Sequence, residues 1–333
     1  SLLVLDIFPE NSLREFDRIR PGGIVVRRRH TQSPAQVKNL IRKHQQRSDI
    51  PLLVAANFEW GVGNDVRGSR SLFPGTLALS AACQGGNYGL VYEQARAIGS
   101  EARALGVNTI FGPMIDVILS DAATDGGTRS FSQDPREVAR FGREYVRGLR
   151  DAGVASTCKH FPGVESGRVD PHVNFATNTN DLRALSQTGL IPFTVAVDRA
   201  HGGVMMSHIA FPKLDSRRLP ATLSPTMIRL LREKLKFKGF IITDNMAMGA
   251  VANHFSPEEL FLGPLRAGSD LVLIGTDKAI PETLAACERI ISRDPDLQVK
   301  INAAFKRIMT LRKRWKMGKA WGNSEPLAKK SIA

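Results

Sequence analysis

The chain contains 333 residues, which is within the usual length of a single α/β barrel and enough for a large hydrophobic core. Hydrophobic residues make up 42% of it and charged residues 23%, as in an ordinary globular protein, and no apolar run approaches the roughly 18 residues that a membrane-spanning helix needs. The formal net charge of +14 would suit a nucleic-acid-binding protein, but the sequence carries no DNA- or RNA-binding signature, so we expect neither a nucleic-acid partner nor a membrane span.

Eight short apolar runs recur at fairly even spacing along the chain. The first, directly after Ser1, lacks the basic flank and small-residue cleavage site of a signal peptide, which by itself says little about the compartment. We expect a cytoplasmic protein, with a secreted or periplasmic location left open. The runs have the length and composition of buried strands, and the predicted strands are Leu2–Ile7, Gly23–Val26, Leu52–Ala56, Thr109–Phe111, Ala155–Cys158, Gly203–Met206, Phe240–Thr243 and Leu271–Ile274.

Segments with helical periodicity lie between these runs. Ser33, Asp134 and Ser224 each precede a proline, which places an N-capping side chain before a proline at the first helical position. The predicted helices are Ser12–Ile19, Pro34–Gln46, Asn87–Leu105, Pro135–Ala152, Pro225–Leu235 and Pro281–Ser292.

The alternation of eight strands with helices predicts an α/β fold, either a closed parallel barrel or a doubly wound sheet. No Gly-x-Gly-x-x-Gly follows the first strand, which weakens the dinucleotide-binding alternative. The count of eight favours a (β/α)₈ TIM-type barrel, in which the first elements can be irregular or missing. No linker, repeat or low-complexity stretch divides the chain, so we expect residues 1–333 to form one domain and the protein to be a monomer.

The three cysteines, Cys83, Cys158 and Cys287, are scattered and odd in number. Neither a CxxC nor a His-x-x-x-His spacing is present. We therefore expect buried free thiols, no disulfide framework and no metal site.

The positive charge is concentrated in a basic C-terminal helix and tail, predicted from about residue 305 to 333. This segment has nine Lys and Arg and one acidic residue, Glu325, so it contributes +8 and leaves +6 for the first 304 residues. We expect a solvated face; attraction to an anionic polymer, such as cell wall or nucleic acid, is the alternative. The basic residues are Lys306, Arg307, Arg312, Lys313, Arg314, Lys316, Lys319, Lys329 and Lys330.

Polar side chains follow the predicted strands at the C-terminal ends, where a parallel barrel gathers its chemistry. The connections after strands three, four and five are longer than usual, which indicates functional loops. The polar residues at these strand ends are Asn57 and Glu59, Asp116, Lys159 and His160, Ser207 and His208, and Asp244.

Asp244 ends the buried run Ile241-Ile242-Thr243, and an Asp in that position can simply cap the following helix. A chemical role is the other interpretation. Lys159 and His160 belong to the same rim, where they would keep a carboxylate ionised and donate hydrogen bonds to hydroxyl groups. Arg129 can donate in the same cavity, because a guanidinium makes rigid bidentate contacts.

The segment from Gly163 to His172 contains two glycines, which indicates a loop able to move. Asp170 and His172 are two positions apart, so their side chains share a side of an extended backbone. A carboxylate beside an imidazole fixes the tautomer of the ring and favours its protonated form. An ordinary surface loop with incidental charges is the alternative.

These motifs are similar to those of the family-3 glycoside hydrolases, and among them to the β-N-acetylglucosaminidases (β-N-acetylhexosaminidases). The resemblance runs from Pro21-Gly22-Gly23-Ile24 to Ala267-Gly268-Ser269-Asp270. Residues 230–244 fit the family's active-site signature, in which the Asp after Ser or Thr is the nucleophile; here it is Asp244. Three further segments resemble the family, and the Lys and His of the first of them bind sugar hydroxyls: Lys159-His160-Phe161-Pro162-Gly163, Arg129-Ser130-Phe131 and Pro220-Ala221-Thr222-Leu223-Ser224.

The loop after strand five sets the subfamily in this resemblance. In the family's acetylglucosaminidases an Asp-Ser-His follows the Lys-His segment, and its His is the acid/base with the Asp as partner. Here Asp170-Pro171-His172 stands at the same distance, with His172 thirteen positions after Lys159. Other members take a carboxylate acid/base from elsewhere, often from a second domain, which we do not expect in this chain. The resemblance therefore implies His172 as acid/base and Asp170 as its partner.

The sequence departs from the family pattern at several positions. Asn57 stands where the family has an Asp that accepts hydrogen bonds from sugar hydroxyls, and a neutral amide is a weaker acceptor. The family's second Arg in this region corresponds to Arg67 or Arg70, and spacing does not decide between them. Pro171 replaces a small Ser, and Asn245 replaces a common second Asp.

The resemblance implies a retaining exo-glycosidase that releases terminal β-linked N-acetylglucosamine from peptidoglycan fragments and needs no cofactor or metal. Its expected substrate-binding residues are Asn57, Arg67, Arg129, Lys159 and His160. A β-glucosidase or β-xylosidase of the same family is one alternative, and it should not need the Asp170–His172 pair. A non-catalytic carbohydrate-binding homologue is the other, motivated by Asn57.

Overall fold

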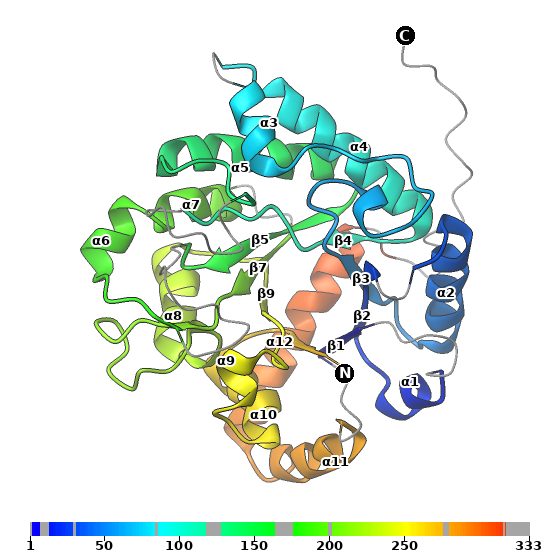
Figure 1. The fold of residues 1–333 in the computed structure, drawn as a ribbon. Coiled ribbons are helices and arrows are strands. Elements are labelled where there is room, and N and C mark those ends of the chain that lie inside the picture. The colour runs from blue at the N-terminus through cyan, green and yellow to red at the C-terminus, as the bar shows by residue number, and fades with distance from the viewer. Residues whose placement is uncertain are drawn as a thin grey trace.

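Eight parallel strands form one sheet at the centre of the molecule, in the order β10-β1-β2-β3-β4-β5-β7-β9 (Figure 1). The computed structural model describes residues 2–6, 13–28, 31–83, 86–117, 128–163, 176–198, 202–275, 280–315 and 317. A parallel bridge between Ile242 on β9 and Leu271, just before β10, joins the two outer strands and brings the sheet round into a barrel. The predicted (β/α)₈ TIM-type barrel is confirmed.

All eight predicted strands are present. Three keep their predicted bounds, whereas β5 continues to Phe161 and so carries Lys159 and His160 within the strand. The barrel strands are β1 (Leu3–Asp6), β2 (Gly23–Val26), β3 (Leu53–Ala56), β4 (Thr109–Ile110), β5 (Ala155–Phe161), β7 (Gly203–Met206), β9 (Phe240–Thr243) and β10 (Val272–Ile274); β6 (Ala176–Thr177) and β8 (Ile209–Ala210) form a separate pair.

Helices surround the barrel (Figure 1). Ser33, Asp134 and Ser224 cap their helices as predicted, each side chain accepting a backbone N–H in the first turn. The helices are α1 (Leu13–Ile19), α2 (Pro34–Arg47), α3 (Thr76–Ala82), α4 (Gly89–Leu105), α5 (Pro135–Asp151), α6 (Leu182–Gln187), α7 (Leu190–Asp198), α8 (Pro225–Arg229), α9 (Gly249–Ala252), α10 (Pro257–Ala267), α11 (Ile280–Ile291) and α12 (Pro295–Arg314).

Several helices differ from the prediction. We did not predict α3, α6, α7, α9 or α10, although Ser256 and Glu259 form a capping box at the start of α10. The predicted helix Pro225–Leu235 is α8 followed by a π-helical turn over Leu230–Lys234. The basic C-terminal helix begins at Pro295, ten residues before the predicted start, because Asp294 caps it there.

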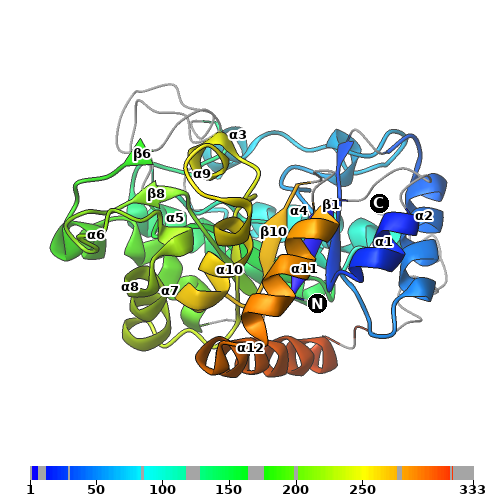
Figure 2. The same cartoon turned by 90° about the horizontal axis from the view of Figure 1, so that it is seen from below.

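Helix α12 covers the end of the barrel where the strands begin (Figure 2). Its residues Ile308 and Leu311 line a small apolar cavity together with Leu53 and Phe240, the first residues of β3 and β9. The guanidinium of Arg312 donates to the carbonyl oxygen of Gly22 at 2.6 Å. In Figure 2 this helix lies on the opposite side of the barrel from β6 and α9. It therefore does not cover the face at which the strands end.

Asp270 ties this closed end to the strand that carries the candidate nucleophile. Its carboxylate is fully buried and accepts from Nε of Arg307 on α12 and from the backbone N–H of Ile241, both at 2.7 Å. The same carboxylate contacts Arg232. These contacts fix the start of β9, and Asp244 follows its other end.

One further expectation, which concerns the cysteines, is met. Cys83, Cys158 and Cys287 are buried free thiols. Within the described part of the chain, no helix combines the length and apolar character needed to cross a membrane.

Candidate active site

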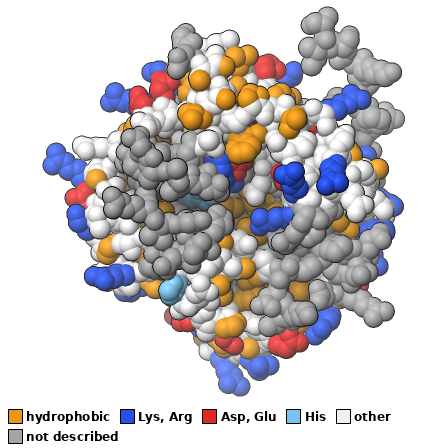
Figure 3. Space-filling view, in the orientation of Figure 1, with side chains coloured by type: hydrophobic (Ala, Val, Ile, Leu, Met, Phe, Trp, Pro, Cys, Tyr) orange, Lys and Arg blue, Asp and Glu red, His pale blue; other side chains and the backbone are white. Residues whose placement is uncertain are grey.

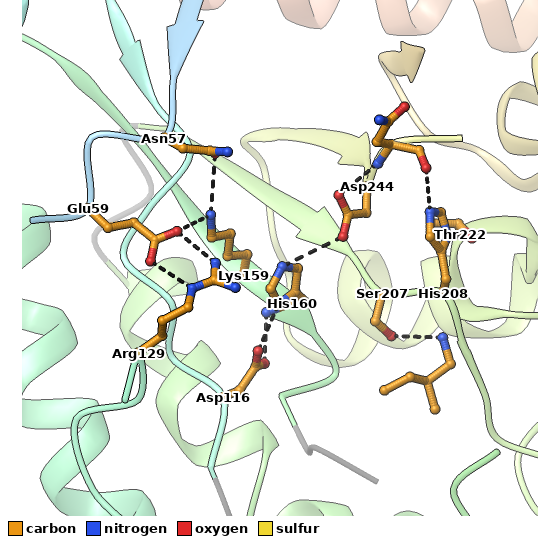
Figure 4. Close-up of polar contacts among 12 residues, drawn as sticks. Asn57, Glu59, Asp116, Arg129, Lys159, His160, Ser207, His208, Thr222 and Asp244 are labelled. Carbon is orange, nitrogen blue, oxygen red and sulfur yellow. Dashed lines mark hydrogen bonds and ion pairs between the residues drawn. The ribbon is translucent and has the colours of Figure 1, made fainter. Parts of the chain in front are cut away.

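Polar side chains from five neighbouring strands converge where those strands end (Figure 4). This follows from the parallel sheet, because the carboxyl ends of all its strands lie at one face of the barrel. In the space-filling view this face is hollowed near its centre, and histidine and charged side chains are visible inside the hollow (Figure 3). The residues are Asn57 and Glu59 after β3, Asp116 after β4, Lys159 and His160 on β5, His208 after β7 and Asp244 after β9.

Glu59 is the centre of a buried charged cluster. Its Oε1 lies 2.5 Å from Nζ of Lys159 and 2.8 Å from Nη2 of Arg129, while its Oε2 accepts from Nε of Arg129 at 3.2 Å. The hydroxyl of Tyr145 on α5 donates to the backbone oxygen of Glu59 at 2.9 Å and so anchors this loop. The cluster holds both cations in fixed positions at the ends of the strands.

The pKa values within this cluster follow from burial and pairing. Burial by itself would raise the pKa of Glu59, but the charges of Lys159 and Arg129 and their hydrogen bonds lower it to about 2. Burial lowers the pKa of Lys159, and the facing Glu59 carboxylate offsets part of that effect. Glu59 is therefore an anion at neutral pH.

Asp116 holds the His160 ring. Its Oδ1 accepts the backbone N–H of His160 and its Oδ2 contacts Nδ1 of the ring, both at 2.7 Å. Since an ionised carboxylate only accepts, Nδ1 carries a hydrogen. The other ring nitrogen, Nε2, faces Oδ2 of Asp244 at 3.7 Å. Asp116 thus orients the imidazole towards the carboxylate that ends β9.

Asp244 is held both by β7 and by its own segment. Its backbone N–H donates to the backbone oxygen of Met206 on β7 at 3.1 Å, and its Oδ1 accepts the N–H of the next residue, Asn245, at 2.7 Å. Burial opposes its ionisation, but the His160 and His208 imidazoles, the Asn245 N–H and the Lys159 ammonium together bring its pKa below the ordinary value for Asp. The side chain keeps 22% of its surface exposed. Asp244 is therefore an ionised carboxylate that solvent can reach.

The family of the chain is decided by comparison with known proteins. The sequence model of the glycosyl hydrolase family 3 N-terminal domain matches residues 15–311. This chain belongs to glycosyl hydrolase family 3. A β-hexosaminidase from Xylella fastidiosa (strain 9a5c) is 34% identical over 269 residues, which are 80% of this chain and 79% of that protein.

Solved structures of family-3 proteins have the same fold. A family-3 β-N-acetylglucosaminidase from Paenibacillus sp. str. FPU-7 superposes with a TM-score of 0.87 at 30% identity, over 99% of this chain. The β-N-acetylglucosaminidase from Thermotoga maritima gives a TM-score of 0.79 at 26% identity, over 97% of this chain. This chain spans 63% of the Paenibacillus protein and 68% of the Thermotoga protein.

The structure brings together most of the sequence-predicted site residues that it describes. Lys159, His160, Arg129 and Asp244 lie in one cluster, and Asn57 joins it through its Oδ1, 3.5 Å from Nζ of Lys159. The end of β9 therefore lies among the other predicted residues, and the roles of these residues stay predictions.

The remaining predicted residues have other positions. Arg67 and Arg70 are exposed on the loop after β3, and no contact among the described residues joins either side chain to the cluster. Their assignment stays a prediction. Asp170 and His172, the predicted acid/base pair, lie outside the described residues.

Three residues of the site were noted in the sequence as polar residues at strand ends but were given no role. Glu59, Asp116 and His208 make the contacts that orient Lys159, His160 and Asn245. Their position at the ends of predicted strands was the signal that could have indicated a place in the site. No sequence pattern indicates which partner each contacts, because the partners lie about 40 or 100 positions away. The described residues include no group of three or more His, Cys, Asp or Glu arranged to hold a metal ion.

Proposed function

We propose that this family-3 protein is a retaining exo-glycosidase that releases terminal β-linked N-acetylglucosamine. The observation that carries the proposal is the Asp244 carboxylate, which is ionised and accessible, accepts the N–H of Asn245 and lies 3.7 Å from Nε2 of His160. Such a carboxylate can attack an anomeric carbon and form a covalent glycosyl-enzyme.

The cluster around Glu59 supplies the groups that bind the sugar in this proposal. The buried ammonium of Lys159 and the guanidinium of Arg129 are held in place by Glu59, so they can donate to hydroxyls with little loss of conformational freedom. Nε2 of His160 faces the reacting carboxylate. Asn57 is exposed beside Lys159 and offers a neutral acceptor or donor to a hydroxyl.

The acid/base role belongs to His172, with Asp170 as its partner, and this part rests on the family resemblance of the loop. His172 would protonate the leaving oxygen while Asp244 attacks, and would then deprotonate the water that releases the sugar with net retention. An imidazole with an ordinary pKa of about 6.5 can serve both steps near neutral pH. The proposed steps require no metal or cofactor.

The proposed substrate class takes its support from the relatives. A β-hexosaminidase and β-N-acetylglucosaminidases are among the proteins most similar to this chain. We infer peptidoglycan fragments, in which N-acetylglucosamine is β-1,4-linked to a muramic acid, as the source. The net charge of +14 suits the anionic muramyl group.

The test compares aryl β-N-acetylglucosaminide, β-glucoside and β-xyloside at equal concentration, with the Asp244→Asn variant as the matched control. We expect turnover of the first substrate above the other two, absence of turnover in the variant, and a β-configured product at early times by NMR. Preference for the glucoside or xyloside would replace the substrate assignment. Saccharide binding without turnover by the wild-type protein would make it a binding homologue, and an α-configured first product would exclude the retaining mechanism.

A further inference from the structure

His208 and the segment Pro220–Ser224 form a buried structure directly behind Asp244. His208 follows β7 and is 2% exposed, and Thr222 is fully buried in a 3₁₀ turn over Ala221–Leu223. The backbone N–H of Thr222 donates to the oxygen of Ser207 at 3.1 Å, which fixes the turn against the strand end. The segment resembles one of the family motifs, yet neither Thr222 nor His208 has a part in the steps proposed above.

Both ring nitrogens of His208 have a partner. Nδ1 lies 3.0 Å from Oγ1 of Thr222, and Nε2 lies 3.0 Å from the backbone oxygen of Asn245 (Figure 4). A carbonyl oxygen only accepts, so Nε2 carries a hydrogen whether the ring is neutral or protonated. The Thr222 hydroxyl can donate or accept, and therefore fixes the ring plane in either state.

The residue that receives this hydrogen bond also supports Asp244. The N–H of Asn245 donates to Oδ1 of Asp244 at 2.7 Å, while the carbonyl oxygen of Asn245 is held by His208. The side-chain oxygen of Asn245 accepts the N–H groups of Gly275 at 2.8 Å and Ala247 at 3.1 Å. Asn245 is thus held at three points.

We propose that His208 is a positioning residue for the nucleophile: its Nε2–H fixes the carbonyl of Asn245, and Thr222 fixes the ring, so that the N–H of Asn245 stays on Oδ1 of Asp244. This role rests on the proposed function of Asp244. It also gives a physical reason for the buried threonine of the Pro220–Ser224 segment.

The consequence for Asp244 follows from the donors around its carboxylate. Of the described residues, the His160 ring, the His208 ring and the Lys159 ammonium act on its charge, with Asp116 behind His160. The N–H of Asn245 is the donor that lies on the carboxylate itself. A fixed donor stabilises the ionised form and restricts its rotation. If the N–H of Asn245 moves away, the pKa of Asp244 rises towards its ordinary value. The carboxylate is then no longer held in the orientation that attack on the anomeric carbon requires.

A matched pair of neutral substitutions separates this role from the charge of the ring. In His208→Gln the amide nitrogen reaches about as far as Nε2 and can still donate to the carbonyl of Asn245, whereas in His208→Asn it reaches only as far as Nδ1. Any positive charge of the ring is lost equally in both. We expect His208→Asn to lower kcat by roughly tenfold or more with little change in KM and to shift the acid limb of the rate profile upward. His208→Gln should recover most of the lost kcat and most of the shift in the acid limb.

A second pair keeps the test informative if His208 variants fold poorly. Thr222→Ser retains the hydroxyl, whereas Thr222→Val retains the shape and removes it. We expect Thr222→Val to show the same kind of change as His208→Asn, to a smaller degree, and Thr222→Ser to resemble the wild type. Equal kcat, KM and acid limb within each of the two pairs would overturn the proposal.

A readout that needs no turnover distinguishes failure of this proposal from failure of the proposed function. The side-chain carboxyl carbon of Asp244, assigned by its absence in Asp244→Asn, can be titrated by NMR. We expect its midpoint to be higher in His208→Asn than in the wild type and to return in His208→Gln. A midpoint that is identical in all three proteins overturns the positioning role, whatever the activity; a shifted midpoint in a protein that turns over no glycoside would support the role and reject the proposed function.

Discussion

The substitution Glu59→Gln tests the electrostatic account of the charged cluster around Glu59. The pKa of Glu59 falls from an ordinary 4.5 to about 2, and the side chain is only 10% exposed. At about 1.4 kcal/mol for each unit of pKa, this lowering of the pKa corresponds to about 3 kcal/mol in the free energy of unfolding. Because the folded-state pKa is the lower one, that stability is fully present above about pH 4.5 and is lost as the pH falls towards 2.

The assay is urea unfolding of wild type and Glu59→Gln at pH 7 and at pH 3. We expect the variant to be less stable by about 3 kcal/mol at pH 7 and by less than half of that at pH 3, where the carboxylate of the unfolded wild-type chain is already largely protonated. Glu93→Gln is the matched control, since its ion pair with Arg96 is solvent-exposed and should contribute less than about 1 kcal/mol. A loss below 1 kcal/mol for Glu59→Gln at pH 7, or an equal loss at both pH values, would refute the reasoning.

Three further outcomes follow from the proposed mechanism. Asp244→Asn should lower kcat by at least about a thousand-fold while circular dichroism shows an intact fold; a near-normal rate would remove Asp244 as nucleophile. His172→Ala should be strongly impaired on substrates with poor leaving groups and less so on activated aryl glycosides, which need little protonation; an equal, small effect on all substrates would count against His172. Asn57→Asp should either lower KM for N-acetylglucosaminides, because an ionised acceptor binds hydroxyls more strongly, or raise the acid limb through repulsion of Asp244; no change in KM, kcat or pH profile would show that position 57 does not contact the sugar.

The strands were predictable because each is a short apolar run that the barrel buries on both sides. β2, β7 and β9 begin and end where the sequence predicts. A proline after a capping residue predicted the starts of α2, α5 and α8. The same pair also begins α10 and α12, whose starts we did not predict from it. In contrast, neither α6 nor α7 begins with a proline after a capping residue. The strands β6 and β8 have two residues each, which is too short for a periodicity.

For the site, the sequence by itself determined which residues end the strands and, through the family signature, that Asp244 is the residue to consider as nucleophile. Only the tertiary structure decided the pairings: Glu59 with Lys159 and Arg129, Asp116 with His160, and His208 with Asn245. The physical reason is that side chains separated by about 40 to 100 positions meet only when the strands take a particular register in the barrel, and a pattern with a period of two or 3.6 residues contains no information about that register.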